Sequence, residues 1–140
     1  MKVVFLYKYE NIEFIPIIES LAAYFMKRNK EIIININSEK NYENCYEDVT
    51  VILTNTFNDF LELYCLTRNK RKVMIFTNNT NENFIRMLLM IVKHISYIRC
   101  ESIYFKNSLE FKRYLLKNNR RLYNNIINFA KYVEKVDQIE

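Results

Sequence analysis

The stretch KVVFLYKYENIEFIPIIESLAAYFMKRNKEIIINI, residues 2–36, decides the fold of this chain. Its first and last segments, 2–8 and 31–36, are apolar and rich in β-branched and aromatic residues, which favours strands. Between them, 16–28 spaces its apolar residues as one face of a helix does. A strand, a helix and a second strand in this order predict a βαβ unit with parallel strands.

The corner between the first strand and the helix contains no glycine. It reads YKYENIEF (7–14), and the 140-residue chain has no glycine at all. In many βαβ units glycine at this corner lets a phosphate approach the backbone closely. Here the side chains from Tyr9 to Ile12 would fill that space, and Glu10 would repel a phosphate. We therefore predict a corner that holds no anionic group.

The rest of the chain repeats the alternation of strands and helices. Apolar strand patterns lie at 49–54, 72–77 and 102–105, a polar loop at 37–48, and helical patterns at 57–65, 84–95, 108–116 and 122–136. Apolar strands that alternate with helices predict a parallel sheet covered on both faces. We predict an α/β fold, a three-layer Rossmann-like sandwich whose mostly parallel five-stranded sheet has the order 3-2-1-4-5.

Length and composition fit one folded domain. The 140 residues, half of them apolar, can bury a substantial core, so we expect a single domain over 1–140 with a C-terminal helix, about 120–136, packed back on it. The longest apolar run, FIRMLLMIV (84–92), is shorter than the roughly 18 to 20 residues of a membrane span. With no cleavable signal pattern at the N-terminus, we expect a soluble, cytoplasmic protein.

Cysteine and histidine do not form a recognisable metal motif. Cys45, Cys65 and Cys100 are isolated, and His94 is the only histidine. We expect neither a metal nor a bound cofactor, and we read His94 as a cation near the end of the 84–95 helix. No catalytic residue is assigned.

The loops after the first and fourth strands supply the candidate ligand-binding residues. In open parallel sheets ligands lie beyond the carboxyl ends of the strands, where the strand order reverses. For the predicted order this crevice lies between the first and fourth strands. Its candidate residues are Lys8, Tyr9, Asn11, Thr77, Asn78 and Asn79. The loop TNTFND (54–59) would lie further from the crevice. Asn and Thr are also turn and capping residues, so the alternative is a purely structural role.

Two further surfaces are candidates for contact with partners. The candidate contacts with an anion or nucleic acid are Lys70, Arg71, Arg120 and Arg121, and the candidate interface residues are Phe84, Met87, Met90 and Ile91. The basic residues could instead complement helix C-termini. The apolar set suits a protein partner, a homodimer or a peripheral membrane contact, unless its helix simply packs across the sheet.

Two stretches share their order of features with a known enzyme family. MKVVFLYKYENIEFIPIIESLAAYFMKRNKEIIINI (1–36) runs from strand to loop, helix and strand, and KVMIFTNNTNENFIRMLLMIVKHISYIRCESIYFKNSLEFKRYLL (72–116) continues with a strand, a polar loop, a helix, a short strand and a serine. Together they resemble the N-terminal, acceptor-binding lobe of GT-B glycosyltransferases. The resemblance implies a Rossmann-like lobe that binds an acceptor.

Three departures from that family limit what the resemblance implies. The glycine-rich loop after the first strand is missing. Asn78 or Asn79 stands where the family has a histidine, and asparagine cannot accept a proton. We expect no counterpart of the lobe that binds the sugar nucleotide within these 140 residues, so a sugar nucleotide would require a second lobe from a separate chain.

The sequence thus leads to one leading hypothesis and two alternatives. We predict a small binding or regulatory module that is non-catalytic on its own. Abundant Asn, Ile, Lys and Tyr are typical of an AT-rich genome, and the hypothesis includes a viral origin. The alternatives are the acceptor-lobe subunit of a split glycosyltransferase and a protein that binds a nucleotide or nucleic acid.

Overall fold

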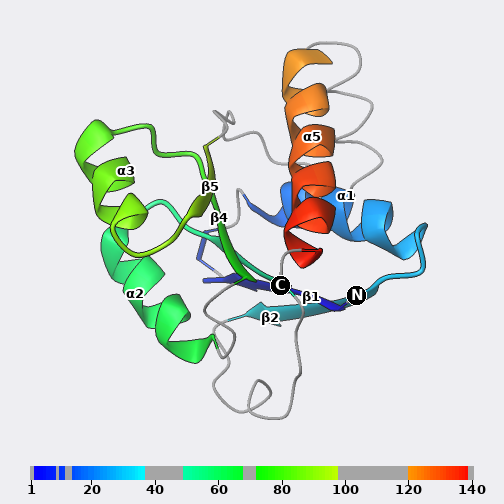
Figure 1. Ribbon diagram of the computed structural model, residues 1–140, viewed down its shortest axis with the longest axis horizontal. Helices are drawn as coiled ribbons and strands as arrows, with labels where there is room; N and C mark the ends of the chain where they lie inside the picture. The colour runs from blue at the N-terminus through cyan, green and yellow to red at the C-terminus, as the bar shows by residue number, and fades with distance from the viewer. Residues whose placement is uncertain are drawn as a thin grey trace.

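Five parallel strands form one sheet in the order β2-β1-β3-β4-β5 (Figure 1). This computed structural model describes residues 2–8, 10–11, 14–36, 49–67, 72–97 and 120–138. The strands are β1 (Lys2–Tyr7), β2 (Glu31–Ile36), β3 (Val49–Leu53), β4 (Val73–Thr77) and β5 (His94–Tyr97), and the helices are α1 (Ile15–Met26), α2 (Phe57–Leu66), α3 (Glu82–Leu89) and α5 (Arg120–Asp137). The predicted α/β, Rossmann-like class is confirmed.

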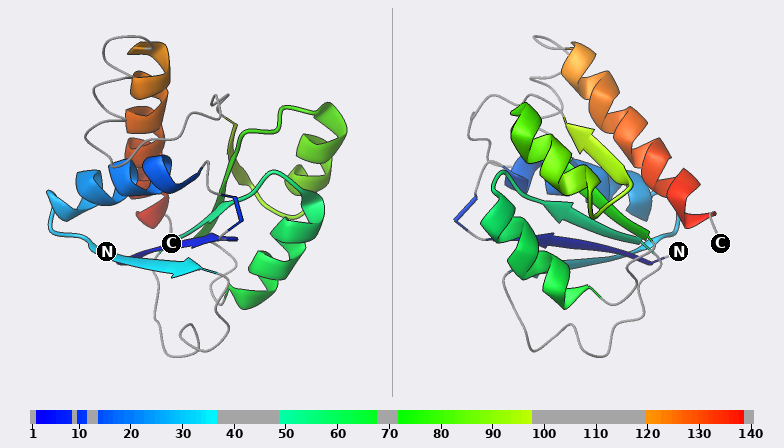
Figure 2. Two further views of the ribbon diagram at one scale, coloured as in Figure 1. Left: turned by 180° about the vertical axis from the view of Figure 1, so that it is seen from behind. Right: turned by 60° about the vertical axis from the view of Figure 1, so that its left-hand side comes forward.

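Helices cover both faces of the sheet. Helices α1 and α5 lie on one face, and α2 and α3 lie on the other (Figure 2). Alternate residues of β1, β3 and β4 contribute to the two cores: in β1, Phe5 packs with α1 and α5, whereas Leu6 packs with α2 and α3. All five residues of β3 and all five of β4 are buried. Burial on two faces explains why these strands are continuously apolar.

The strand order differs from the predicted 3-2-1-4-5. Strand β1 pairs with β2 on one side and with β3 on the other, which places β2 at the edge and β3 in the centre. The residue types agree with the position of β3 in the centre of the sheet and of β2 at its edge. VTVIL in β3 is completely buried, whereas EIIINI in β2 begins with the exposed Glu31, paired with Lys2 at 3.6 Å between Nζ and Oε2. A wholly buried strand gains most from neighbours on both sides, and an edge strand tolerates charge.

The 84–95 segment is not one continuous helix. Helix α3 ends at Leu89, and His94 begins strand β5, which pairs with β4. Phe84 and Leu88 turn one face of α3 into the core, and Met90, just past the end of the helix, is 86 % exposed. The β-branched residues that follow favour the extended chain. The segments 37–48, 102–105 and 108–116, for which a loop, a strand and a helix are predicted, lie outside the described residues.

The corner after β1 turns without glycine. The amide of Asn11 donates to the carbonyl of Lys8 at 2.9 Å, and the amide of Phe14 donates to the carbonyl of Asn11 at 3.2 Å. The first bond closes a four-residue turn. Phe14 is fully buried, with its ring edge-on to that of Phe76 at 6.3 Å. Tyr9 and Ile12, predicted to fill the corner, lie outside the described residues.

Asn29 takes the position after a helix that glycine most often occupies. Its φ of 58° is the only positive value among the described residues. The amide of Lys30 donates back to the carbonyl of Phe25 at 3.1 Å, as in the left-handed ending of many helices. Apart from glycine, asparagine is the residue that tolerates this conformation best.

We predict that the left-handed backbone at position 29 makes the stability of the fold sensitive to a residue there that has a Cβ atom but no polar side-chain group. Asn29→Ala should lower the free energy of unfolding by about 1 kcal/mol, because alanine pays the full steric cost of a positive φ. Asn29→Gly should leave that free energy unchanged or raise it. Urea denaturation of both variants measures the difference, and equal stabilities for the two would contradict the left-handed assignment.

Candidate functional site

The observed strand order moves the expected ligand crevice. In the order 2-1-3-4-5 the reversal lies between β1 and β3, so a ligand would lie beyond the carboxyl ends of those two strands. The loop 54–59 after β3 therefore borders the crevice, contrary to the expectation that it lies aside. The loop 77–80 after β4 lies one strand further away. We call the residues after the carboxyl ends of β1, β3 and β4 the carboxyl edge.

Lys8 crosses the crevice and binds to α2. Its Nζ lies 3.3 Å from Oδ1 of Asp59 and is also paired with the carboxylate of Glu62. Asn11 reaches the same helix, because its Nδ2 donates to Oδ2 of Asp59 at 3.5 Å. Only 12 % of the Lys8 side chain is exposed. The hydrogen bond to Glu62 and the pairing with Asp59 raise the pKa of Lys8, although burial alone would lower it. The ammonium is therefore a permanent cation that holds the two sides of the crevice together.

Asn55 links the loops after β3 and β4. Its Oδ1 accepts from the hydroxyl of Thr77 at 3.2 Å and from the amide of Asn78 at 2.8 Å. The Nδ2 of Asn79 donates to the backbone carbonyl of Asn55 at 2.9 Å, and the Oδ1 of Asn79 accepts from the amide of Asn81 at 3.0 Å. Both polar atoms of the Asn79 side chain thus serve the loop, which supports the structural alternative for this residue.

The helix N-termini at this edge are capped from within the chain. Thr56 accepts from the amide of Asp59 at 3.2 Å at the start of α2, and Asn81 accepts from the amides of Asn83 and Phe84 at 3.0 and 3.2 Å at the start of α3. The first turns also contain the acids Asp59 and Glu82. Caps and carboxylates occupy the sites that a bound anion would use.

His94 lies at the opposite end of the sheet from the carboxyl edge. It begins β5 rather than ending a helix, which corrects our reading of it as a helix C-terminal cation. Its Nδ1 lies 2.8 Å from the hydroxyl of Tyr132 on α5, with the two rings edge-on. Burial, followed by the nearby Lys93, lowers the pKa of His94. The imidazole is therefore neutral at neutral pH and serves the packing of α5.

The other predicted site residues fall into three groups. Tyr9, Lys70 and Arg71 lie outside the described residues, and Arg120 and Arg121 form the start of α5. Of the predicted interface residues, Phe84 is buried in the core with α2, whereas Met87, Met90 and Ile91 are exposed together with Leu89. Within the described ranges, no three His, Cys, Asp or Glu residues are grouped as metal ligands. None of the described helices is long and apolar enough to cross a bilayer.

Sequence reasoning missed the residues that organise the carboxyl edge. Asp59 and Glu62 were not candidates, although their spacing of three residues on a helix places them on one face. Asn55 lies in the loop that was set aside because of the predicted strand order. The spacing was readable from the sequence, but the proximity of Lys8 depends on which strand β1 pairs with.

We predict that Asn55 makes the largest polar contribution to stability at this edge. Asn55→Ala should lower the free energy of unfolding by about 2 kcal/mol, because the buried Thr77 hydroxyl and the Asn78 amide lose an acceptor. Asn55→Asp keeps an acceptor oxygen at the same position and should retain most of the stability. Urea titrations of the two variants give the comparison, and a neutral Asn55→Ala change would contradict the network.

We predict a loss of stability on mild acidification that depends on His94. The pKa of His94 is lowered in the folded state. Near and below the ordinary histidine pKa of about 6.5, the imidazole therefore binds more protons in the unfolded chain than in the folded one. The free energy of unfolding should therefore fall as the pH drops from about 7.5 to about 5.5, above the range in which ordinary carboxylates titrate. His94→Gln should remove this dependence. An equal dependence in the variant would assign it to other groups.

Comparison with protein families, with curated proteins and with solved structures found no match for this chain.

Proposed function

We propose that this chain is a binding or regulatory module that is non-catalytic on its own and is built on a Rossmann-like scaffold. The observation that carries the proposal is the position of Lys8 between Asp59 and Glu62 at the switch point. An anionic ligand in the crevice would have to compete with two carboxylates for this ammonium. The carboxyl edge, where the fold usually binds its ligand, thus uses its charges to close the structure.

The proton chemistry of the β1 end supports the same proposal. General acid–base catalysis uses a side chain that can give or take a proton near neutral pH. The pKa of Lys8 is raised by its hydrogen bond to Glu62, and burial, followed by the charge of Glu19, raises the pKa of Tyr7. Both groups therefore keep their protons at neutral pH. The only histidine lies at the start of β5, away from this edge.

Both alternatives from the sequence would bring a phosphate to the fold, a nucleotide or nucleic acid directly and a sugar nucleotide only together with a second lobe. A nucleotide, or a sugar nucleotide held with a second lobe, contains phosphates that usually bind to free backbone amides at a helix N-terminus. At α2 and α3 the side chains of Thr56 and Asn81 already accept from such amides, and Asp59 and Glu82 add negative charge. These contacts favour the binding module over a phosphate-binding protein at this edge.

Thermal unfolding with added ligands tests the proposal. We expect that nucleotides, sugar nucleotides and short oligonucleotides do not bind at the carboxyl edge. They should therefore leave the melting temperature of the chain unchanged. A ligand present at about 100 times its Kd would stabilise the fold by about 2.7 kcal/mol and raise the melting temperature by several degrees.

A matched pair of variants locates any shift that does occur. Lys8→Met removes the cation at the switch point, and Arg86→Met removes an exposed cation on α3. A shift with a nucleotide or a sugar nucleotide that is lost in Lys8→Met but kept in Arg86→Met would place a phosphate ligand at the carboxyl edge and overturn the proposal.

A further inference from the structure

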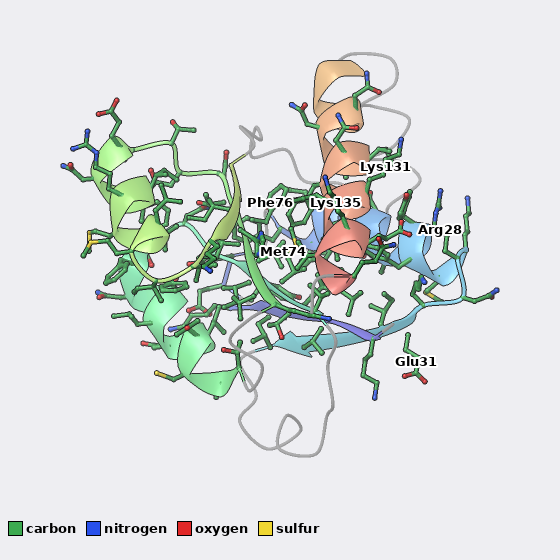
Figure 3. The ribbon with its side chains drawn as sticks, in the orientation of Figure 1. Arg28, Glu31, Met74, Phe76, Lys131 and Lys135 are labelled. Carbon is green, nitrogen blue, oxygen red and sulfur yellow. The ribbon has the colours of Figure 1, made fainter. Side chains whose placement is uncertain are left out.

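An open groove lies where the C-terminal parts of α1 and α5 meet. It encloses about 310 Å³ and is lined by Tyr24, Arg28, Lys131, Glu134, Lys135 and Gln138. Figure 3 shows Arg28 at the end of α1 and the two lysines on α5. Among the described lining residues, three cations and one carboxylate give a net charge of +2. None of these residues was a candidate in the sequence. We call this surface the α1–α5 groove.

Arg28 is held in place by its neighbours. Its guanidinium carbon lies 3.6 Å from the centre of the Tyr24 ring, and its Nη1 donates to the carbonyl of Tyr24 at 3.3 Å. Its Nε lies 3.7 Å from Oε1 of Glu134. A guanidinium fixed in this way still has further N–H donors, and it loses little side-chain entropy when a carboxylate binds.

Glu134 is partly buried, and its charge is already engaged. It accepts a hydrogen bond from the hydroxyl of Tyr24, and it forms an ion pair with Arg28. Burial, followed by this hydrogen bond, raises the pKa of Tyr24, so the phenol remains a donor at neutral pH. The one carboxylate of the groove therefore holds Tyr24 and Arg28, which leaves the lysines as its outward charge.

Among the described residues, Lys131 and Lys135 have no carboxylate partner. They lie one helical turn apart and are both exposed, an arrangement in which like charges repel. Within the described part of the chain, no carboxylate lies within ion-pair distance of either ammonium. Lys135 is in the last turn of α5 and complements the helix dipole there, but Lys131 lies before that turn. A bound carboxylate would remove the repulsion.

We propose that the α1–α5 groove binds an acidic segment of a protein partner. This inference names a contact surface for the binding module proposed above and rests on that proposal. The geometry disfavours nucleic acid, because Arg28 covers one face of Tyr24 and Phe25 stands edge-on to the ring at 5.4 Å, which obstructs base stacking.

Fluorescence anisotropy with a labelled Glu-Ser repeat peptide tests the inference. The measurement uses the full chain at about 0.1 M salt, where charges more than about 10 Å apart are largely screened. We expect saturable binding of this peptide and none of the same peptide with Gln in place of Glu. Lys131→Gln/Lys135→Gln should weaken binding about fivefold or more, because it removes two exposed ion pairs.

A second double variant separates the groove from overall charge. Arg86→Gln/Lys93→Gln removes the same number of exposed cations from the α3 and β5 region, and its affinity for the peptide should stay within about twofold of the unchanged chain. Equal weakening in both double variants would show non-specific attraction and overturn the inference. So would no binding of the Glu peptide, or a labelled oligonucleotide that binds more tightly and loses affinity in the groove variant.

Circular dichroism of both double variants checks that each is folded. Changes in the NMR chemical shifts of the backbone amides of the unchanged chain, on addition of the peptide, locate the binding site independently. Shifts confined to α1 and α5 support the groove, and shifts elsewhere contradict it. Failure of the peptide to bind would leave the ligand panel at the carboxyl edge unaffected. A nucleotide shift that depends on Lys8 would overturn the proposed function instead.

Discussion

The pairing of β1 with β3 is the interaction on which the rest of this structure depends. Val3 to Leu6 align with Val49 to Ile52, and every one of these residues is buried. This register joins the βαβ unit at the N-terminus to the β3–α2–β4 part of the fold. It also ends both strands at the same edge, which brings Lys8 within reach of Asp59 and Glu62. One backbone pairing therefore defines both the core and the chemistry of the carboxyl edge.

The absence of glycine changes how the turns of this fold are made. At the end of α1, Asn29 takes the left-handed conformation. At the start of α2 and α3, the side chains of Thr56 and Asn81 bind backbone amides. Asn55 and Asn79 then connect two neighbouring loops. Polar side chains that could bind a ligand in another protein here satisfy the backbone, because buried amides and carbonyls need partners.

The electrostatics of the two surfaces differ in one respect. At the carboxyl edge the cation is paired with two carboxylates and is largely buried. At the α1–α5 groove, Glu134 is the one carboxylate among the described lining residues and is engaged by Tyr24 and Arg28, and the two lysines are exposed. Long-range attraction of a partner depends on charge that is not already compensated. The groove has such charge, and this contrast underlies the proposed role of the chain as a binding module.

The sequence by itself determined the class of the fold and the type of most elements. The apolar runs of β1, β3 and β4 and the helical spacing of α1 and α5 were readable because burial on both faces of a sheet imposes them. The end of α3 was not readable, since the apolar run 84–92 continues past Leu89 and favours a longer helix. Only the tertiary structure decided that β1 pairs with β3, that Lys8 meets Asp59 and Glu62, and that Arg28 meets Glu134. Each of these contacts joins segments far apart in the chain, and local residue patterns do not specify which of several compatible segments become neighbours.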